Sequence, residues 1–288
     1  SNSGTPLLLP SCNCIAMDGR AMLDPHQPPS CTRPKGEARS VRILITGATG
    51  ALGGALARQL AGPDSHLLLW GRNAERLSAI AANCQAAGAQ VTALQLDLSE
   101  IPVALAALRA GDDAAPIDAA LFVAGQGDGL AEGEVVESAE QVARLANINF
   151  TAPAALAAEL AGRMATRGSG RLLLVGSAAG FHALPQAPAY AASKAGLARF
   201  AEAVRIAVQP HGVQVTLVSP GFIDWAEGGR PMPRGLMLSL DKAAQRILAA
   251  FDKGAGHTII PRRFALLRWL DRALPTALRD RLLRSLKP

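Results

Sequence analysis

A serine, a tyrosine and a lysine in the middle of the chain have the spacing of a proton-transfer site. Tyr190 follows Ser177 by thirteen residues, and Lys194 follows the tyrosine by four. Four residues make about one helical turn, so the ammonium group would favour the phenolate and lower its pKa from about 10. The serine hydroxyl could then bind a substrate oxygen while Tyr190 gives or takes a proton. The trio predicts a site that reduces or forms a carbonyl.

Tyr190 and Lys194 alone would also fit an ordinary helix with a half-buried tyrosine and a solvated lysine. The surrounding elements must therefore distinguish a catalytic site from such a helix. The apolar run 41–46 reads as a strand, a glycine cluster follows it, and the alanine-rich run 55–60 reads as a helix. Such a turn lets the backbone approach a pyrophosphate at the helix N-terminus. The expected cofactor contacts in this turn are Gly47, Thr49, Gly50, Ala51, Leu52 and Gly53.

With this turn the chain resembles the short-chain dehydrogenase/reductase family, whose turn reads Thr-Gly-x-x-x-Gly/Ala-x-Gly. Thr46, Gly47, Ala51 and Gly53 occupy those places, and the resemblance runs from about Val41 to Pro261. Further matches follow in chain order at Asp97-Leu98, Ala124-Gly125, Asn149 and Pro220-Gly221.

The resemblance implies a role for each of these positions. Asp97 would lie near the adenine ring, and Pro220-Gly221 would form the turn beside the nicotinamide. Asn149 would complete a catalytic tetrad through a water held near the lysine. Tyr190 would act as the general acid or base, Ser177 would position the substrate oxygen, and Lys194 would also hold the ribose hydroxyls.

Two positions depart from the family pattern. Val123 replaces a polar residue that helps to tie the central strands together, which we interpret as structural variation. After Gly221 the family usually continues to a threonine that binds the carboxamide, whereas this chain reads Phe222-Ile223-Asp224-Trp225. The backbone at Ile223 could supply that contact, and Trp225 could instead form a wall of the substrate pocket.

The residues after the second strand favour NADP(H) over NAD(H). A site for NAD places a carboxylate there for the ribose 2′-hydroxyl, whereas a 2′-phosphate requires a cation. Gly71 stands in the place of the acid, and Arg72 follows it. The alternative is that Arg72 is a solvent-facing residue at the start of a helix.

The alternation of strands and alanine-rich helices predicts the α/β class, with a doubly wound, parallel seven-stranded sheet (Rossmann fold) and a helical C-terminal extension. The chain has 288 residues, of which 49% are hydrophobic. No stretch has the roughly 20 uninterrupted apolar residues that a membrane span needs. The expected strands are 41–46, 66–70, 91–95, 118–123, 171–176, 213–218 and 257–260.

Residues 1–40 are rich in proline and polar residues, and we expect a disordered leader. Cys12, Cys14 and Cys31 lie in it without a fourth ligand at a convincing spacing, so we expect no metal site. The run 7–9 is too short for a signal-peptide core, and we expect a cytoplasmic protein.

Residues 262–288 form a basic tail that carries a net charge of +6, as large as that of the whole chain. Leucines recur in it at helical spacing, which predicts two short amphipathic helices. They could contact an anionic membrane surface, cap the substrate pocket or pack on another subunit. No nucleic-acid recognition fold accompanies the charge, so we expect no nucleic-acid binding.

These features together predict an NADP(H)-dependent oxidoreductase acting on an apolar ketone or aldehyde, with Phe181, His182 and Trp225 lining the substrate pocket. The alternatives are a non-catalytic NADP-binding sensor or scaffold and an extended-type sugar-nucleotide epimerase. All four tetrad positions are present, which argues against the sensor. Only about seventy residues follow Pro220, which argues against the epimerase. The family resemblance implies a homodimer or homotetramer.

Overall fold

The computed structural model describes residues 40–131, 133–224, 237–261, 263–265 and 273–285. The predicted leader lies outside these ranges except for Ser40, as does part of the predicted tail. No helix in the described ranges is long and apolar enough to cross a membrane.

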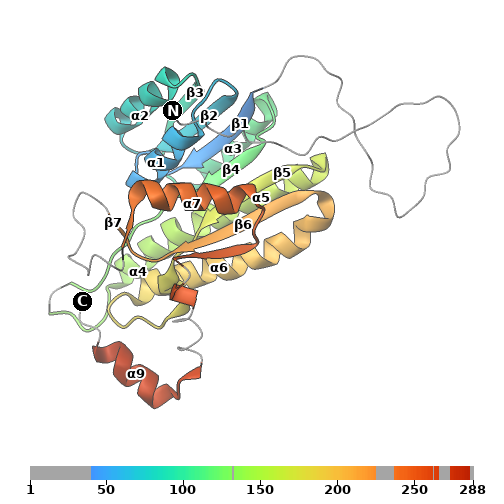
Figure 1. Cartoon of the computed structure of the whole chain (residues 1–288). Coiled ribbons are helices and arrows are strands. Elements are labelled where there is room, and N and C mark those ends of the chain that lie inside the picture. The colour runs from blue at the N-terminus through green and yellow to red at the C-terminus, as the bar shows by residue number, and fades with distance from the viewer. Residues whose placement is uncertain (1–39, 132, 225–236, 262, 266–272, 286–288) are drawn as a thin grey trace, which may run out of the picture. The chain divides into compact units, whose positions relative to one another are not determined.

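Seven parallel strands form the central sheet, as predicted, in the order β3-β2-β1-β4-β5-β6-β9 (Figure 1). The strands are β1 (Val41–Thr46), β2 (Ser65–Gly71), β3 (Gln90–Gln95), β4 (Ala119–Phe122), β5 (Gly170–Val175), β6 (Val213–Pro220) and β9 (His257–Ile260). A second, two-stranded sheet of β7 (Ile223–Asp224) and β8 (Leu238–Ser239) was not predicted.

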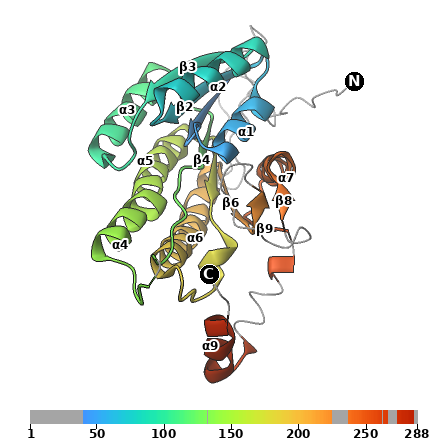
Figure 2. The ribbon, with the colours of Figure 1, turned by 90° about the vertical axis from the view of Figure 1, so that its left-hand side faces the viewer.

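Helices cover both faces of the sheet, with α3, α5 and α6 on the left and α1 and α7 on the right of Figure 2. The helices are α1 (Ala51–Leu60), α2 (Ala74–Ala86), α3 (Ile101–Ala114), α4 (Ala139–Ala146), α5 (Ala152–Arg167), α6 (Pro188–Val208), α7 (Leu240–Asp252) and α9 (Thr276–Ser285). A π-helical turn, η1 (Asn147–Thr151), joins α4 to α5, and two 3-10 turns occur at η2 (Ala178–Phe181) and η3 (Gln209–His211).

The central strands consist mainly of apolar residues because both faces of the sheet are buried. Ile43, Leu44 and Ile45 in β1 are all at most 1% exposed. Leu156 of α5 and Leu197 of α6 pack into the same core cluster as Leu44. This core fixes the strands and helices from which the site side chains project.

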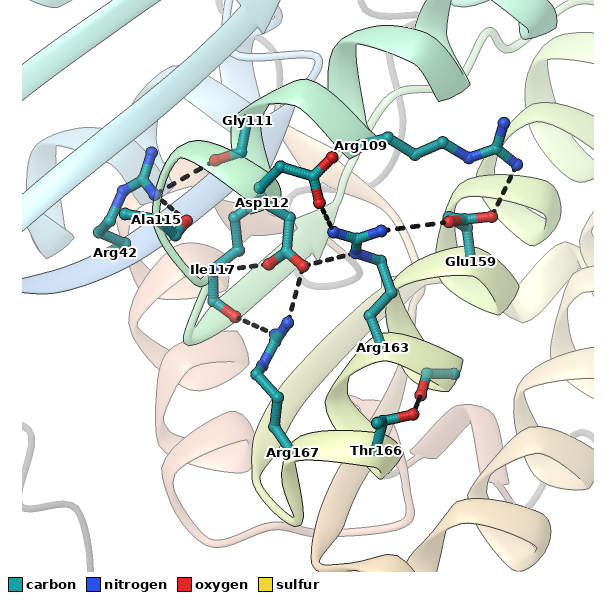
Figure 3. Close-up of polar contacts among 12 residues, drawn as sticks. Arg42, Arg109, Gly111, Asp112, Ala115, Ile117, Glu159, Arg163, Thr166 and Arg167 are labelled. Atoms are coloured by element: carbon teal, nitrogen blue, oxygen red, sulfur yellow. Dashed lines mark hydrogen bonds and ion pairs between the residues drawn. The ribbon is translucent and has the colours of Figure 1, made fainter.

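A buried carboxylate, Asp112, joins α3 to α5 near the start of β4 (Figure 3). Asp112 accepts hydrogen bonds from Arg163 Nε at 2.6 Å and from Arg167 Nη1 at 2.7 Å. Its second oxygen accepts the backbone N–H of Ile117 at 2.8 Å. Asp113, the next residue, also contacts Arg163 but is exposed. Glu159, which is partly exposed, also lies 3.9 Å from Arg163, so Asp112 is the buried acid of the ionic cluster and Asp113 its solvent-facing one.

The strand order reverses between β1 and β4, and this is where a doubly wound sheet binds its ligand. The parallel strands present their carboxyl ends at one edge, so the residues that follow β1, β2, β4, β5 and β6 gather there.

Candidate active site

Ser177 and Tyr190 are brought together by the end of β5 and the start of α6. Ser177 opens the turn η2, and its Oγ accepts the backbone N–H of Ala179 at 3.1 Å. The Ser177 side chain lies beside the Tyr190 hydroxyl and interacts with it. Burial raises the pKa of Tyr190 above its ordinary value, and the interaction with Ser177 opposes that rise.

Lys194 lies one turn along α6 with its side chain buried. Its Nζ donates to the Val175 carbonyl at 3.1 Å and lies 6.0 Å from the centroid of the Tyr190 ring. Burial lowers the pKa of Lys194 to about 8. The prediction that the lysine produces a net fall in the pKa of Tyr190 is therefore wrong for this structure, because desolvation of the phenol outweighs the opposing effects.

Asn149 lies beneath the lysine in the π-helical turn and is fully buried. Its Oδ1 accepts the backbone N–H of Gln126 at 2.8 Å, and its Nδ2 donates to the Gln126 carbonyl at 2.9 Å. A Cβ atom at Gly125 would lie 3.0 Å from Asn149 Oδ1 and 3.1 Å from Lys194 Nζ. The asparagine thus anchors the loop after β4 directly beside the lysine. Single-turn π-helices often occur at functional sites.

A cleft of about 960 Å³ runs along the carboxyl edge of the sheet and contains most of the predicted site residues. Those that line it are Gly47, Thr49, Gly50, Ala51, Leu52, Gly53, Arg72, Leu98, Ala124, Gly125, Ser177, Tyr190, Lys194, Pro220, Gly221 and Ile223.

Four predicted residues that the structure describes do not line this cleft, and a fifth lies outside the described residues. Asn149 lies behind it, and Asp97 is exposed with Oδ1 accepting from the N–H and hydroxyl of Ser99 at 2.9 and 2.8 Å. Phe181 lines a separate cavity of about 270 Å³ with His257, and the ring of His182 lies 6.4 Å from that of Phe181. Trp225 lies outside the described residues.

The glycine turn brings β1 and β4 into close contact. Gly47 has a φ of +71°, and a Cβ atom there would lie 2.7 Å from Ala124 Cα, so only glycine fits. The Thr46 Oγ accepts the backbone N–H of Val123 at 3.2 Å. The tie between the two strands that Val123 was expected to lack is thus made by the threonine hydroxyl.

Helix α1 starts at this turn without a side-chain cap. Its N-cap, Gly50, contributes no side chain, and its first turn contains no acidic residue. The N–H groups at the helix N-terminus are therefore suited to an anion such as a pyrophosphate.

The cleft ends at two arginines, one of which the sequence did not suggest. Arg76 lines the cleft together with Arg72, and the Asn73 side chain caps α2 by accepting the N–H of Arg76 at 2.8 Å. Arg72 Nη1 lies 3.9 Å from Asp97 Oδ2, and both side chains are about half exposed. The spacing of four residues on a capped helix was the signal that could have identified Arg76.

Gly71 precedes these arginines and is closely covered by Thr49. A Cβ atom at Gly71 would lie 2.4 Å from Thr49 Cγ2 and 2.8 Å from its Oγ1. A carboxylate side chain therefore cannot occupy this position without displacing the threonine.

Among the described residues, no group of three or more His, Cys, Asp or Glu side chains could hold a metal ion. Cys12, Cys14 and Cys31 lie outside that part of the chain.

Comparisons with known proteins agree with this geometry. Residues 41–231 match the family model of the short chain dehydrogenases. An uncharacterised oxidoreductase of Myxococcus xanthus is 32% identical over 248 residues, which cover 85% of this chain and 96% of that protein.

Two solved structures share the fold. A short-chain dehydrogenase from Sphingobium yanoikuyae in complex with NADPH is 30% identical, with a TM-score of 0.71 over 85% of this chain and 96% of the other. The bulky-bulky ketone specific alcohol dehydrogenase from Comamonas testosteroni is 25% identical, with a TM-score of 0.70 over 85% and 94%. The chain belongs to the short-chain dehydrogenase/reductase family and is an oxidoreductase enzyme of that family.

Proposed function

We propose that the protein is an NADP(H)-dependent oxidoreductase that reduces a carbonyl to an alcohol, or catalyses the reverse reaction. The observation that carries the proposal is the pair Ser177 and Tyr190 beside the buried Lys194, all lining one cleft. At the other end of that cleft are Arg72 and Arg76. A proton-transfer pair and a cationic phosphate site in the same cleft support reduction with a phosphorylated dinucleotide.

In this proposal Ser177 donates a hydrogen bond to the substrate oxygen and Tyr190 donates the proton in reduction. Lys194 stabilises the tyrosinate that results and binds the ribose hydroxyls. Asn149 acts from behind the cleft by fixing the loop at Gln126. The nicotinamide would supply or accept the hydride when bound.

The residues that would hold the cofactor fit such a group. The uncapped start of α1 at Gly50 suits the pyrophosphate, and Leu96 and Leu98 provide apolar walls for an adenine. Pro220, Gly221 and Ile223 lie at the end of β6, near the place proposed for the nicotinamide.

Two features at the end of β2 support a preference for NADP(H). Arg72 and Arg76 supply two guanidinium groups, which pair well with phosphate. Thr49 excludes from position 71 the acid that would bind the 2′-hydroxyl of NAD. The NADPH complex of the Sphingobium relative is consistent with this preference.

We propose an apolar ketone or aldehyde as the substrate. Phe222, which is 46% exposed, follows the turn at Gly221, and Ile223 lines the cleft. The Comamonas structure is described as specific for bulky-bulky ketones, so such ketones belong in a first substrate panel.

The proposal is tested by mixing the protein with NADPH and a panel of ketones, aldehydes and quinones while following the absorbance of the reduced nicotinamide. We expect turnover on at least one carbonyl and a loss of at least about a thousandfold in Tyr190→Phe, with NADPH still bound. Tight NADPH binding without turnover on any carbonyl would favour a sensor, and full activity of Tyr190→Phe would exclude the proposed proton donor.

We also propose that the tail 262–288 contacts an anionic membrane surface. In α9, Leu278 is 53% exposed, and Arg281 and Arg284 follow it in the same helix. An apolar side chain among cations is typical of helices that lie in the membrane interface. Co-sedimentation with phosphatidylserine vesicles should depend on residues 262–288, and equal binding after their deletion would contradict the proposal.

A further inference from the structure

Glu137 is a buried acid in a loop whose neighbouring residues face solvent. It lies just before α4 and is 6% exposed, whereas Val135 and Val136 are 87% and 69% exposed. Its Oε2 accepts the backbone N–H of Ala189 at 2.7 Å. Glu137 therefore links the loop after β4 to the residue that immediately precedes Tyr190.

This contact supplies the cap that α6 lacks in its own sequence. Its N-cap, Ala187, provides no side-chain hydrogen bond, and Pro188 has no N–H. The first backbone bond from this end of the helix runs from Ala191 N–H to the Ala187 carbonyl. The N–H of Ala189 thus has no acceptor within the helix, and a carboxylate 52 residues away in sequence accepts it.

The loop that bears Glu137 is tied down at several points. Asn149 holds its start through both backbone groups of Gln126. Farther along, Leu130 N–H donates to the Gln186 carbonyl at 2.9 Å, and Gln141 Nε2 donates to the Gly129 carbonyl at 2.9 Å. The segment before Tyr190 is therefore held by a loop that is itself held at the site asparagine.

Burying the carboxylate of Glu137 costs more free energy than helix capping alone requires. Its other oxygen, Oε1, is buried without a hydrogen-bond partner, one of a few such side-chain atoms in the described part of the chain. A serine, threonine or asparagine at the N-cap would satisfy the helix without burying a carboxylate. The long side chain instead reaches the helix from a second, independently anchored element.

We propose that Glu137 is a positioning residue that fixes the first turn of α6 and so holds the Tyr190 hydroxyl at Ser177. The inference rests on the proposed function, in which Tyr190 is the proton donor. Glu137 acts through the backbone of Ala189 and is not itself a catalytic residue.

Two conservative substitutions of Glu137 separate the effect of the reach of its side chain from the effect of its charge. Glu137→Gln keeps an acceptor oxygen at the same reach, whereas Glu137→Asp keeps the charge but is one methylene shorter. The matched control is Glu134→Gln, an exposed acid in the same loop. We expect kcat on the best carbonyl of the panel to fall about tenfold to a hundredfold in Glu137→Asp and less than about threefold in Glu137→Gln. The NADPH dissociation constant should change less than about twofold in both.

Tyr190 also provides a readout that needs no substrate, because it is the only tyrosine of the chain. Incorporation of 3-fluorotyrosine gives a single fluorine NMR resonance that reports on the Tyr190 ring. That resonance should shift or broaden in Glu137→Asp and stay close to the parent position in Glu137→Gln and Glu134→Gln.

The inference is overturned if Glu137→Asp keeps both the parent resonance and the parent kcat. It is also overturned if Glu137→Gln loses as much as Glu137→Asp, since the reach of the acceptor oxygen alone would then not account for the loss. If Glu137→Asp does not fold, the fluorine resonance of Glu137→Gln is the test. A resonance away from the parent position would then overturn the inference. Failure of the proposed function would appear separately, as turnover that survives Tyr190→Phe.

Discussion

Replacing Asp112 by asparagine should destabilise the protein far more than the same change at its neighbour Asp113. Both acids contact Arg163, but the Asp112 side chain is 1% exposed and that of Asp113 is 66% exposed. Asp112→Asn is nearly isosteric, so it removes the charge without opening a cavity. The new amide would have a single acceptor oxygen, so its NH2 group would face either the two guanidinium groups or the Ile117 N–H that the carboxylate now binds.

The size of the effect follows from the burial of the partners. Removing one member of a buried ion pair costs about 3–5 kcal/mol. Here Arg163 and Arg167 are 29% and 26% exposed, so they can regain some hydration. We therefore expect a loss of about 2–3 kcal/mol for Asp112→Asn, and of at most about 1 kcal/mol for Asp113→Asn. At about 2–3 °C per kcal/mol for a chain of this size, the Tm should fall by about 4–9 °C.

Differential scanning calorimetry of the two variants and the parent, without cofactor, provides the assay. Equal Tm values for Asp112→Asn and Asp113→Asn would refute the assignment of the buried acid as the main contributor. The pH dependence gives a second check, because the arginines and the Ile117 N–H hold the pKa of Asp112 below its usual value against the effect of burial. Its contribution is present above the unfolded pKa of about 3.9 and is lost as pH falls through the folded pKa. The parent should therefore lose stability in acid more steeply than Asp112→Asn.

Two further predictions concern the cleft. Lys194 has a pKa of about 8 when folded, so between pH 8 and its unfolded pKa of about 10.4 the unfolded chain binds more protons, and stability should rise with pH. Urea denaturation at pH 7 and pH 10 measures the rise in the free energy of unfolding. That rise should be smaller in Lys194→Met than in the parent by up to about 3 kcal/mol, and an equal rise in the two proteins would contradict the lowered pKa. Arg72→Ser and Arg76→Ser should each raise KM for NADPH about tenfold and leave KM for NADH nearly unchanged, unlike the exposed α7 control Arg246→Ser. Steady-state kinetics with both cofactors measure this, and a parallel rise for NADH would exclude recognition of the 2′-phosphate.

The strands and the glycine turn were predictable because each depends on a local pattern. The run 41–46 is mostly apolar because its strand is covered on both faces, and Gly47 follows it because the backbone there closely approaches Ala124. Motifs in register with a known family then located Asn149, Ser177, Tyr190 and most of the cleft.

What the sequence could not predict depends on contacts between distant segments. Glu137 reaches Ala189 only because two loops are packed together, and nothing near residue 137 marks it as buried. Phe181 is close to Ser177 in sequence, yet the turn η2 places it in a different cavity. The pKa of Tyr190 was predicted in the wrong direction because charge spacing was visible in the sequence and desolvation was not.

The contact between Thr49 and Gly71 couples two positions in the proposed function. An acid at position 71 would favour NAD, but its Cβ would lie 2.4 Å from Thr49 Cγ2, so the threonine side chain would have to move to make room for it. Under that proposal, cofactor preference depends jointly on two positions, one in each of the first two strand-to-helix turns, and the effect of an acid at position 71 depends on the side chain at position 49.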